Sequence, residues 1–412
     1  MLKEYIFKWR RTILLFILPM LLILCFSAYG NKIYQAHNLV DNKVTSTITN
    51  STIKNNSNST IRIKGEPFFP FGFYHESYNL TFQQLIQAVR DLATAGFNTI
   101  FASCDNLDNY GVFLDEAERV GVFVITSFNV DDPLAVVKKF KDKPAVLGWG
   151  IADDVGDHET RNEILAFHKQ IKAIDPKHLT YISISGWSRK WLGHSNIADL
   201  IGGQSYPISY PFNNKPKGLA NDLSTVHHVF NIGRFEANKY NRPVIANLQT
   251  FRWEEGRWPT ANEVYNMTYQ ALLAGVKGIL FYTYEGYKDN SIRQKPDVWS
   301  RVKSIVPEIN RLTPVLLEGT LTKLDTKFDD VLAGQWIYGS SVYLVVLNTS
   351  QTETRQVVIT IPTPAKGSAQ PLFSGRPSGM RFQDGKLRGF IKPEDVHIYQ
   401  LSQSRVLSTT KE

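Results

Sequence analysis

The feature that most constrains the fold of this chain is a regular alternation of short apolar runs and helical patterns between residues 67 and 313. Runs typical of strands occur at 69–74, 98–103, 122–128, 145–151, 179–185, 199–205, 243–249 and 277–283. Each is followed by apolar residues at helical spacing, at 82–95, 110–120, 133–141, 158–174, about 190–196, 222–240, 261–275 and 297–312. Eight such units predict an α/β fold, the (β/α)8 or TIM barrel, which is typically about 250 residues long. A doubly wound sheet is the alternative, but it rarely contains so many regular units.

A different pattern follows the barrel segment. After Thr313 and Pro314 the chain changes to short alternating or apolar runs, at 331–336, 341–348, 356–361 and 396–401. These runs predict a C-terminal all-β sandwich domain over residues 314–403, followed by a short tail at 404–412. Hydrophobic residues make up 43% of the chain, which is enough for the cores of both domains.

The N-terminus carries the pattern of an export signal. Four basic residues lie among the first eleven positions and precede an apolar segment, 12–28, that contains no charge. Its length is at the short limit for a membrane span, so residues 1–30 are interpreted as either a cleaved signal peptide or an uncleaved membrane anchor. Basic residues before the segment predict a cytoplasmic N-terminus and an exported body. The protein is therefore expected outside the cytoplasm, anchored to the membrane or secreted.

Residues 31–66 are rich in Asn, Ser and Thr, which predicts a flexible linker. Most of the formal net charge of +8 lies in residues 1–66, not in the predicted domains. Charge confined to the membrane-proximal end is no nucleic-acid footprint, so no nucleic-acid partner is expected. The chain has two cysteines, one of them in the apolar segment, so the exported part has no internal disulfide.

The residues at the carboxyl ends of the predicted strands form the candidate site, because barrel enzymes place their active sites there. Carboxylates, amides and aromatic rings dominate these positions. Carboxylates serve as acid and base, amides hydrogen-bond to hydroxyl groups, and aromatic faces stack on sugar rings. This mixture predicts a carbohydrate ligand. The candidate residues are Glu76, Asp153, Asp154, Trp187, Gln204, Tyr206, Gln249, Trp253, Tyr284 and Glu285.

The stretch 145–157 is the most informative part of this set. Its apolar run ends abruptly at Asp153, Asp154 and Asp157. Acidic groups held close together repel one another, which raises the pKa of at least one of them. Such a group can act as a general acid or a metal ligand. The structural alternatives are a solvated loop, or an N-cap and first-turn acid for the next helix.

Residues 149–154, Trp-Gly-Ile-Ala-Asp-Asp, resemble the segment after the fourth strand in glycoside hydrolase barrels of the large retaining clan, the cellulase and β-galactosidase-like superfamily. Pro259-Thr260, the run 274–282 and the trailing β-domain resemble glycosidase-like barrels as well. The resemblance covers about 67–403 and rests on short motifs. It implies a barrel fold and a glycosidase activity, with Asp154 at the position of the acid/base glutamate.

Two positions depart from the pattern of this clan. Asp154 is one methylene shorter than glutamate, and Gln249 stands where the clan has its nucleophile. An amide does not attack an anomeric carbon, so the covalent retaining mechanism is not expected. Glu285 is then the expected base, across the barrel from the general acid Asp154, which favours an inverting reaction. Glu254 or Glu255 is the alternative to Glu285.

Each candidate also has a structural interpretation. Trp187 and Trp253 are more often packing residues than sugar platforms, and Gln204 and Tyr206 can equally satisfy buried backbone. The sequence has no phosphate-binding loop, no serine nucleophile elbow and no histidine spacing typical of a metal site, so neither cofactor nor metal is expected. The chain is interpreted as a divergent glycoside hydrolase-like protein that acts on O-glycosidic bonds of a poly- or oligosaccharide. The alternative is a non-catalytic carbohydrate-binding barrel.

Overall fold

A computed structural model describes residues 60–403 of the 412-residue chain, apart from 64, 75–79, 156–159, 187, 210–221, 287–289, 364 and 378. The chain divides into two compact units, 1–53 and 54–412, and all described residues belong to the second. The predicted N-terminal segment at 1–30, most of the linker and the tail at 404–412 lie outside the described residues.

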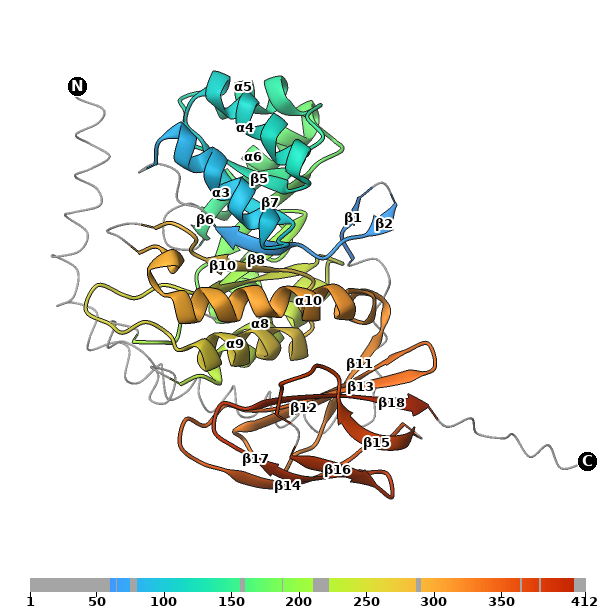
Figure 1. The fold of residues 1–412 in the computed structure, drawn as a ribbon. Helices are drawn as coiled ribbons and strands as arrows, with labels where there is room; N and C mark the ends of the chain where they lie inside the picture. The colour runs from blue at the N-terminus through green and yellow to red at the C-terminus, as the bar shows by residue number, and fades with distance from the viewer. Residues whose placement is uncertain are drawn as a thin grey trace, which may run out of the picture. The chain divides into compact units, whose positions relative to one another are not determined.

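Eight parallel strands form a closed barrel in the order β10-β3-β4-β5-β6-β7-β8-β9 (Figure 1). The strands are β3 (Phe71–Tyr74), β4 (Thr99–Cys104), β5 (Phe123–Phe128), β6 (Val146–Val155), β7 (Leu179–Ile184), β8 (Leu200–Ser205), β9 (Val244–Gln249) and β10 (Ile279–Tyr282). The sheet closes because β10 pairs in parallel with β3. The predicted (β/α)8 barrel is confirmed, and the doubly wound alternative is excluded.

A helix follows each strand. The helices are α3 (Phe82–Thr94), α4 (Leu107–Val120), α5 (Pro133–Phe140), α6 (Arg161–Ile174), α7 (Ser188–His194), α8 (Thr225–Asn238), α9 (Ala261–Leu273) and α10 (Pro296–Glu318), the last preceded by the 3-10 turn η3 (Ile292–Gln294). α10 continues past Pro314, beyond the predicted end at residue 312. A proline removes one backbone donor, but Val315, Leu316 and Leu317 remain buried and extend the packed face of the helix.

The inside of the barrel is filled by large side chains. Tyr74, Phe101 and Tyr181 belong to one buried cluster with aliphatic residues of the other strands. The rings of Tyr74 and Phe101 stack with 4.1 Å between their centroids. Gly202 leaves the space for Tyr181, because a Cβ at this position would lie 2.1 Å from the tyrosine oxygen. The barrel is thus a packed core, and its chemistry is confined to the strand ends.

A short hairpin precedes the barrel. β1 (Arg62–Ile63) pairs with β2 (Glu66–Pro67), and Ile61 is buried in the same cluster as the barrel interior. Phe68 packs edge-on against Phe123 at the start of β5, with 5.1 Å between the ring centroids. The predicted linker over 31–66 therefore ends in folded residues, since apolar side chains at its end cover the amino ends of the strands.

The C-terminal domain consists of two antiparallel sheets, as predicted. The five-stranded sheet has the order β11-β12-β13-β18-β15, and the three-stranded sheet has the order β14-β17-β16. Their inner faces share one core, which contains Val342 and Leu344 from one sheet and Val357 and Leu387 from the other. The strands are β11 (Thr320–Leu324), β12 (Val331–Tyr338), β13 (Ser341–Asn348), β14 (Arg355–Thr360), β15 (Ala365–Pro371), β16 (Met380–Gln383), β17 (Lys386–Ile391) and β18 (Val396–Gln403).

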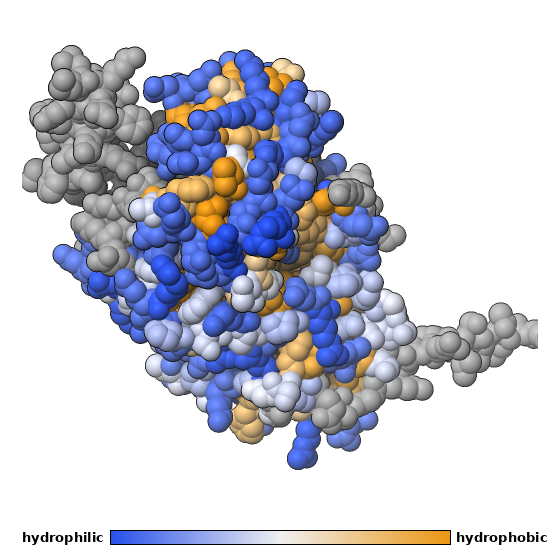
Figure 2. All heavy atoms as spheres, turned by 45° about the horizontal axis from the view of Figure 1, so that its top comes forward, coloured by the Kyte–Doolittle hydropathy of each residue, from blue (hydrophilic) through white to orange (hydrophobic). Residues whose placement is uncertain are grey.

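The five-stranded sheet packs against barrel helices α9 and α10. Glu308 of α10 is buried there, accepts hydrogen bonds from Tyr265 at 2.9 Å and Tyr269 at 2.6 Å, and pairs with Arg376 of the β-domain at 2.5 Å. Polar residues cover most of the molecular face in Figure 2, where apolar residues occur in small groups.

Candidate active site

The carboxyl ends of the eight strands lie at one end of the barrel, here called the rim. The structure places the predicted acidic and amide positions Asp153, Asp154, Gln204, Gln249 and Glu285 on this rim, because each of them ends or follows a strand. Asp105 and Asp131, which follow β4 and β5, lie on the rim as well. Glu76 and Trp187 lie outside the described residues, so their roles stay predictions.

The strand that carries the acidic pair is irregular where the pair occurs. The pairing register between β6 and β7 shifts between Gly150 and Ala152, and again between Ala152 and Val155. Asp154 has a positive φ of 51°, a left-handed conformation that aspartate tolerates better than most residues. Bulges of this kind are common beside active sites, where they re-aim side chains. The irregularity presents Asp153 and Asp154 in succession, both accessible to solvent.

Asp153 and Asp154 share one amide donor. The Nε2 atom of Gln204 lies 2.8 Å from Asp154 Oδ1 and 3.1 Å from Asp153 Oδ1, and the backbone N–H of Asp154 donates to Asp153 Oδ1 at 3.0 Å. The surrounding protein and then the charge of Asp154 raise the pKa of Asp153 to about 7, although hydrogen bonds from Ser183, Asp154 and Gln204 oppose the rise. Solvent still reaches Asp153, so the carboxylate is crowded by protein without being sealed from water.

A chain of hydrogen bonds leads from the barrel interior to Asp153. Tyr74 donates to Tyr181 at 2.9 Å, Tyr181 donates to Asn247 Oδ1 at 3.1 Å, and Asn247 Nδ2 donates to Ser183 Oγ at 2.9 Å.

Ser183 is the last member of this chain. Its oxygen also accepts from Gln204 Nε2 at 3.0 Å, so its single proton is left for the charged acceptor, Asp153. The chain therefore directs a hydroxyl donor at Asp153 and supports its ionised form. Sequence reasoning missed Ser183 and Asn247. The available signal was the amide of Asn247 between apolar neighbours in the strand at 244–249.

An aromatic cluster lies on the rim at β8, β9 and β10. The ring of Tyr206 lies 5.2 Å from Phe251, 6.3 Å from Trp253 and 5.7 Å from Tyr282, measured between centroids. Phe251 contacts both Trp253, at 4.9 Å, and Tyr282, at 5.2 Å. Tyr206, Trp253 and Tyr282 are partly exposed. The structure thus brings Tyr206 and Trp253 together, as a shared site requires, and adds Phe251 and Tyr282.

Gln249 positions this aromatic cluster. Its side chain is fully buried, accepts from the backbone N–H of Ile208 at 2.8 Å, and donates to the backbone oxygens of Ile208 at 3.0 Å and Phe251 at 3.2 Å. Both of its N–H groups are engaged by backbone. The geometry therefore favours a positioning role, and direct contact of Gln249 with a substrate stays a prediction.

Tyr284 and Glu285 differ in direction. Tyr284 is buried, donates to Asp91 of α3 at 2.8 Å and packs beside Trp299, so it faces the helix layer and not the rim opening. Glu285 forms an ion pair with Arg293, whose side chain is 50% exposed. Among the residues that the structure describes, no group of three His, Cys, Asp or Glu side chains could hold a metal ion.

Neither a family model nor a curated protein matches this chain. Solved structures do. The maltogenic α-amylase AmyB from Thermotoga neapolitana matches 81% of this chain and 99% of its own, at 10% identity and a TM-score of 0.52. Amy13B from Eubacterium rectale matches 82% of this chain and 95% of its own, at 10% identity and a TM-score of 0.54. The family 30 subfamily 8 xylanase Xyn30A from Clostridium acetobutylicum matches 84% of this chain and 97% of its own, at 11% identity and a TM-score of 0.51.

This chain shares its barrel fold with these glycoside hydrolases. The expected resemblance is confirmed at the level of the fold, since these enzymes are similar to this chain over most of both chains. AmyP, which matches 81% of this chain and 97% of its own at 10% identity and a TM-score of 0.53, was solved in complex with maltose. Identities of this size establish the fold and do not transfer catalytic residues.

Proposed function

We propose that this protein hydrolyses O-glycosidic bonds of a poly- or oligosaccharide at the rim of its barrel. The observation that carries the proposal is the crowded acidic pair on β6, in which Asp153 has a pKa raised to about 7. A carboxyl group with such a pKa retains a proton near neutral pH and can deliver it to a leaving group. The fold shared with glycosidases and the nearby aromatic cluster support a sugar as the substrate.

Within this proposal Asp153 is the general acid, in place of Asp154, which the sequence alone favoured. Asp153 would protonate the glycosidic oxygen while a water molecule attacks the anomeric carbon and the bond to the leaving group breaks. Asp154, held beside it by Gln204, keeps a negative charge close and so favours the protonated form of Asp153.

The base that accepts the proton of the attacking water is proposed to be Glu285. β6 and β10 lie four strands apart in the eight-stranded barrel, on opposite walls, which suits an acid and a base on two sides of a sugar. Arg293, half exposed, must release Glu285 for this role. A water held between separated carboxylates inverts the anomeric configuration.

The alternative is a barrel that binds a glycan without cleaving it. Two observations favour it: the amide of Gln249 is engaged by backbone where the clan has a nucleophile, and Glu285 is paired with Arg293. A carboxylate in an ion pair is a weaker base than a free one.

Export remains part of the proposal. The apolar segment 12–28, which lies outside the described residues, supports a membrane-anchored or secreted body. In the described part of the chain, no helix is both long and apolar enough to span a membrane. Protease added to intact cells should digest the folded body. Full-length protein in the cytosol, resistant to that protease, would contradict export.

The experiment is a glycan array followed by hydrolysis assays on the strongest ligands. Asp153→Asn should abolish cleavage of substrates with poor leaving groups and largely spare those whose leaving group needs no proton. Glu285→Gln should slow both kinds, because water activation serves every substrate. NMR of the first product should show inversion. Retention would remove Glu285 from the base role, and binding without any hydrolysis would establish the alternative.

A further inference from the structure

The outward face of the three-stranded sheet points away from the barrel. In Figure 1, β14, β16 and β17 lie on the side of the five-stranded sheet opposite to α9 and α10. Their inner residues, among them Val357, Ile359 and Leu387, are buried in the sandwich core. The alternating residues therefore point outward.

The pairing register arranges these outward residues in rows across the strands. One row is Val358, Arg388 and Arg381, the row beside it is Thr360, Lys386 and Gln383, and the third contains Gln356 and Phe390. All are exposed except Lys386, which is partly exposed. This set of eight residues, here called the outer face, contains three cations and no acidic residue.

The two arginines of the outer face are directly opposite each other on antiparallel strands. Side chains in that position have Cβ atoms roughly 4.5–5.5 Å apart, and like charges there are destabilising. Among the described residues, none forms an ion pair with Arg381, Lys386 or Arg388. Elsewhere on the surface arginines do have such partners: Arg90 and Arg119 share Glu116 at 2.5 and 2.6 Å.

The outer face also exposes two large apolar side chains beside its cations. Phe390 is 58% exposed and Val358 48% exposed, next to Gln356 and beside the arginines. An aromatic ring stacks on the face of a sugar, glutamine amides bond to hydroxyl groups, and paired guanidinium groups bind carboxylates with two-pronged hydrogen bonds. A flat, strand-lined surface suits an extended polymer.

We propose that the outer face binds an acidic polysaccharide, with its carboxylates held by Arg381 and Arg388 and a sugar ring stacked on Phe390. The carboxylates of the polysaccharide offset the repulsion between the two arginines. They supply the negative partner that neither arginine has among the described residues. This site lies on the β-domain and does not depend on hydrolysis at the barrel rim.

The test is calorimetric titration of the full-length protein, in neutral detergent, with oligogalacturonate and with its methyl ester, which has the same rings without the charge. Oligogalacturonate should bind, and the ester should bind at least about 10-fold more weakly. The double variant Arg381→Gln/Arg388→Gln should lose at least about 10-fold in affinity for oligogalacturonate. Phe390→Ala should weaken binding of both ligands, because stacking does not require the carboxylate.

The matched control is Arg90→Gln/Arg119→Gln, which removes the same two charges from another part of the surface. It should bind oligogalacturonate as the unmodified protein does. Equal losses in both double variants, equal affinity for acid and ester, or no binding of either would overturn the proposal. So would binding only to phosphatidylglycerol vesicles, which would make the outer face a membrane contact. Thermal unfolding shows that the variants are folded: Arg381→Gln/Arg388→Gln should unfold no earlier than the unmodified protein, since it relieves a like-charge contact.

Discussion

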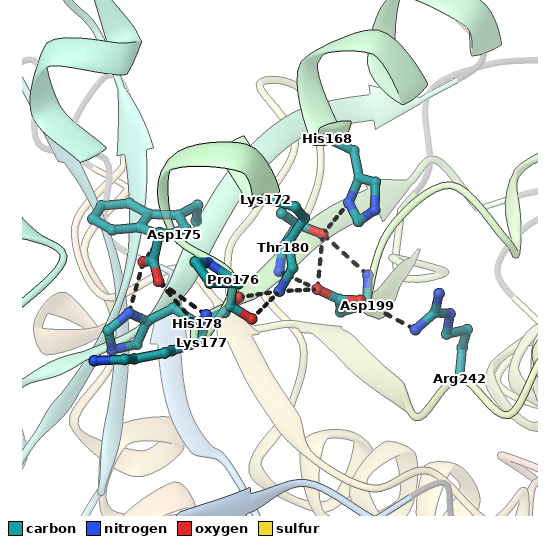
Figure 3. Close-up of polar contacts among 10 residues, drawn as sticks. His168, Lys172, Asp175, Pro176, Lys177, His178, Thr180, Asp199 and Arg242 are labelled. Carbon is teal, nitrogen blue, oxygen red and sulfur yellow. Dashed lines mark hydrogen bonds and ion pairs between the residues drawn. The ribbon is translucent and has the colours of Figure 1, made fainter. Parts of the chain in front are cut away.

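The two ends of the barrel differ in the partners of their carboxylates: those at the amino end contact cations and hydrogen-bond donors, whereas two at the rim lie next to each other. At the amino end, Asp199 before β8 meets cations and donors: Lys172 Nζ lies 3.2 Å away, Arg242 Nη1 3.1 Å, and the backbone N–H of Thr180 3.1 Å (Figure 3). His168 bonds to the same threonine at 2.8 Å. Each group in this network contacts one of complementary character.

Asp175 makes similar contacts at the same end. Trp149 donates to it at 2.8 Å, and His178 lies 2.7 Å from the same oxygen. Burial would raise the pKa of Asp175, but the hydrogen bonds from Trp149 and His178 outweigh it and hold that pKa below its ordinary value.

At the rim, the same strand that carries Trp149 ends in two adjacent carboxylates with one shared amide donor. Here like charges face each other and the pKa of Asp153 rises. On β6, Trp149 therefore has a hydrogen-bond partner of complementary character, whereas Asp153 and Asp154 repel each other. Among these carboxylates, unfavourable contacts between like charges thus occur at the rim and not at the amino end. The rim is the end at which barrel enzymes have their active sites.

The largest effect that tests this difference between the two ends is expected at Asp153. Asp153→Asn should reduce cleavage of substrates that need leaving-group protonation by about 100- to 10,000-fold, the usual contribution of a general acid. The free energy of unfolding should stay the same or increase, because the change removes a repulsion with Asp154. Steady-state kinetics and urea unfolding of the same preparation check both parts. A large loss of stability with unchanged turnover would show that Asp153 stabilises the fold and does not take part in the reaction.

The next effect concerns the amino end. Asp199→Ala should lower the free energy of unfolding by about 2–3 kcal/mol, because it leaves partly buried Lys172 and Arg242 without their shared partner. Turnover and KM of the folded fraction should not change, since the network lies at the opposite end from the rim. Denaturant unfolding gives the first number and kinetics below the unfolding transition the second. A fall in turnover without loss of stability would show that this network reaches the site.

A smaller effect is expected at Ser183, which links the interior chain of hydrogen bonds to Asp153. Ser183→Ala removes a donor to the ionised form of Asp153, so the pKa of Asp153 should move upward by roughly one pH unit, the value of one hydrogen bond to a charged group. Carbon-13 NMR titration of the Asp153 carboxyl measures this directly. The matched control is Ser103→Ala, on β4, where the serine bonds to Ser127 at 2.6 Å. An unchanged or lowered pKa in Ser183→Ala would show that the serine proton points elsewhere.

Local patterns in the sequence were enough for the barrel, because its strands and helices have their own apolar spacing and several helices have capping residues such as Thr160 and Thr260. They also indicated the acidic pair, since Asp153 and Asp154 end an apolar run. The partners of that pair could not be predicted. Ser183 and Asn247 reach Asp153 only through the register of β7 to β9, which sequence spacing does not contain.

The same limit explains Tyr284 and Gln249. Both end or follow a strand, which was the basis for placing them in the site. Whether a side chain there points to the rim, to the helices or to backbone depends on strand twist and loop path. The structure turns Tyr284 toward Asp91 and Gln249 toward the backbone of Ile208. Lys277, buried just before β10, was also unrecognised: it donates to the backbone oxygen of Leu316 near the end of α10.

The smallest effect concerns the free energy of unfolding, to which Asp153 and Asp175 should contribute with opposite dependence on pH. An aspartate in an unfolded chain has a pKa of about 3.9. Asp153 has a raised pKa, so the folded protein binds its proton more tightly, and stability should decline as pH rises from about 4 to about 7. Asp175 has a lowered pKa, so its stabilising contribution is present above the unfolded pKa and is lost as pH falls through the folded one. Urea unfolding should therefore show a flatter profile in Asp153→Asn between pH about 4 and about 7. Asp175→Asn should be less stable than the unmodified protein at neutral pH, and it should lose less stability when the pH is lowered below about 4. If both variants changed the profile in the same direction, the two ends of the barrel would not differ in the way their contacts imply.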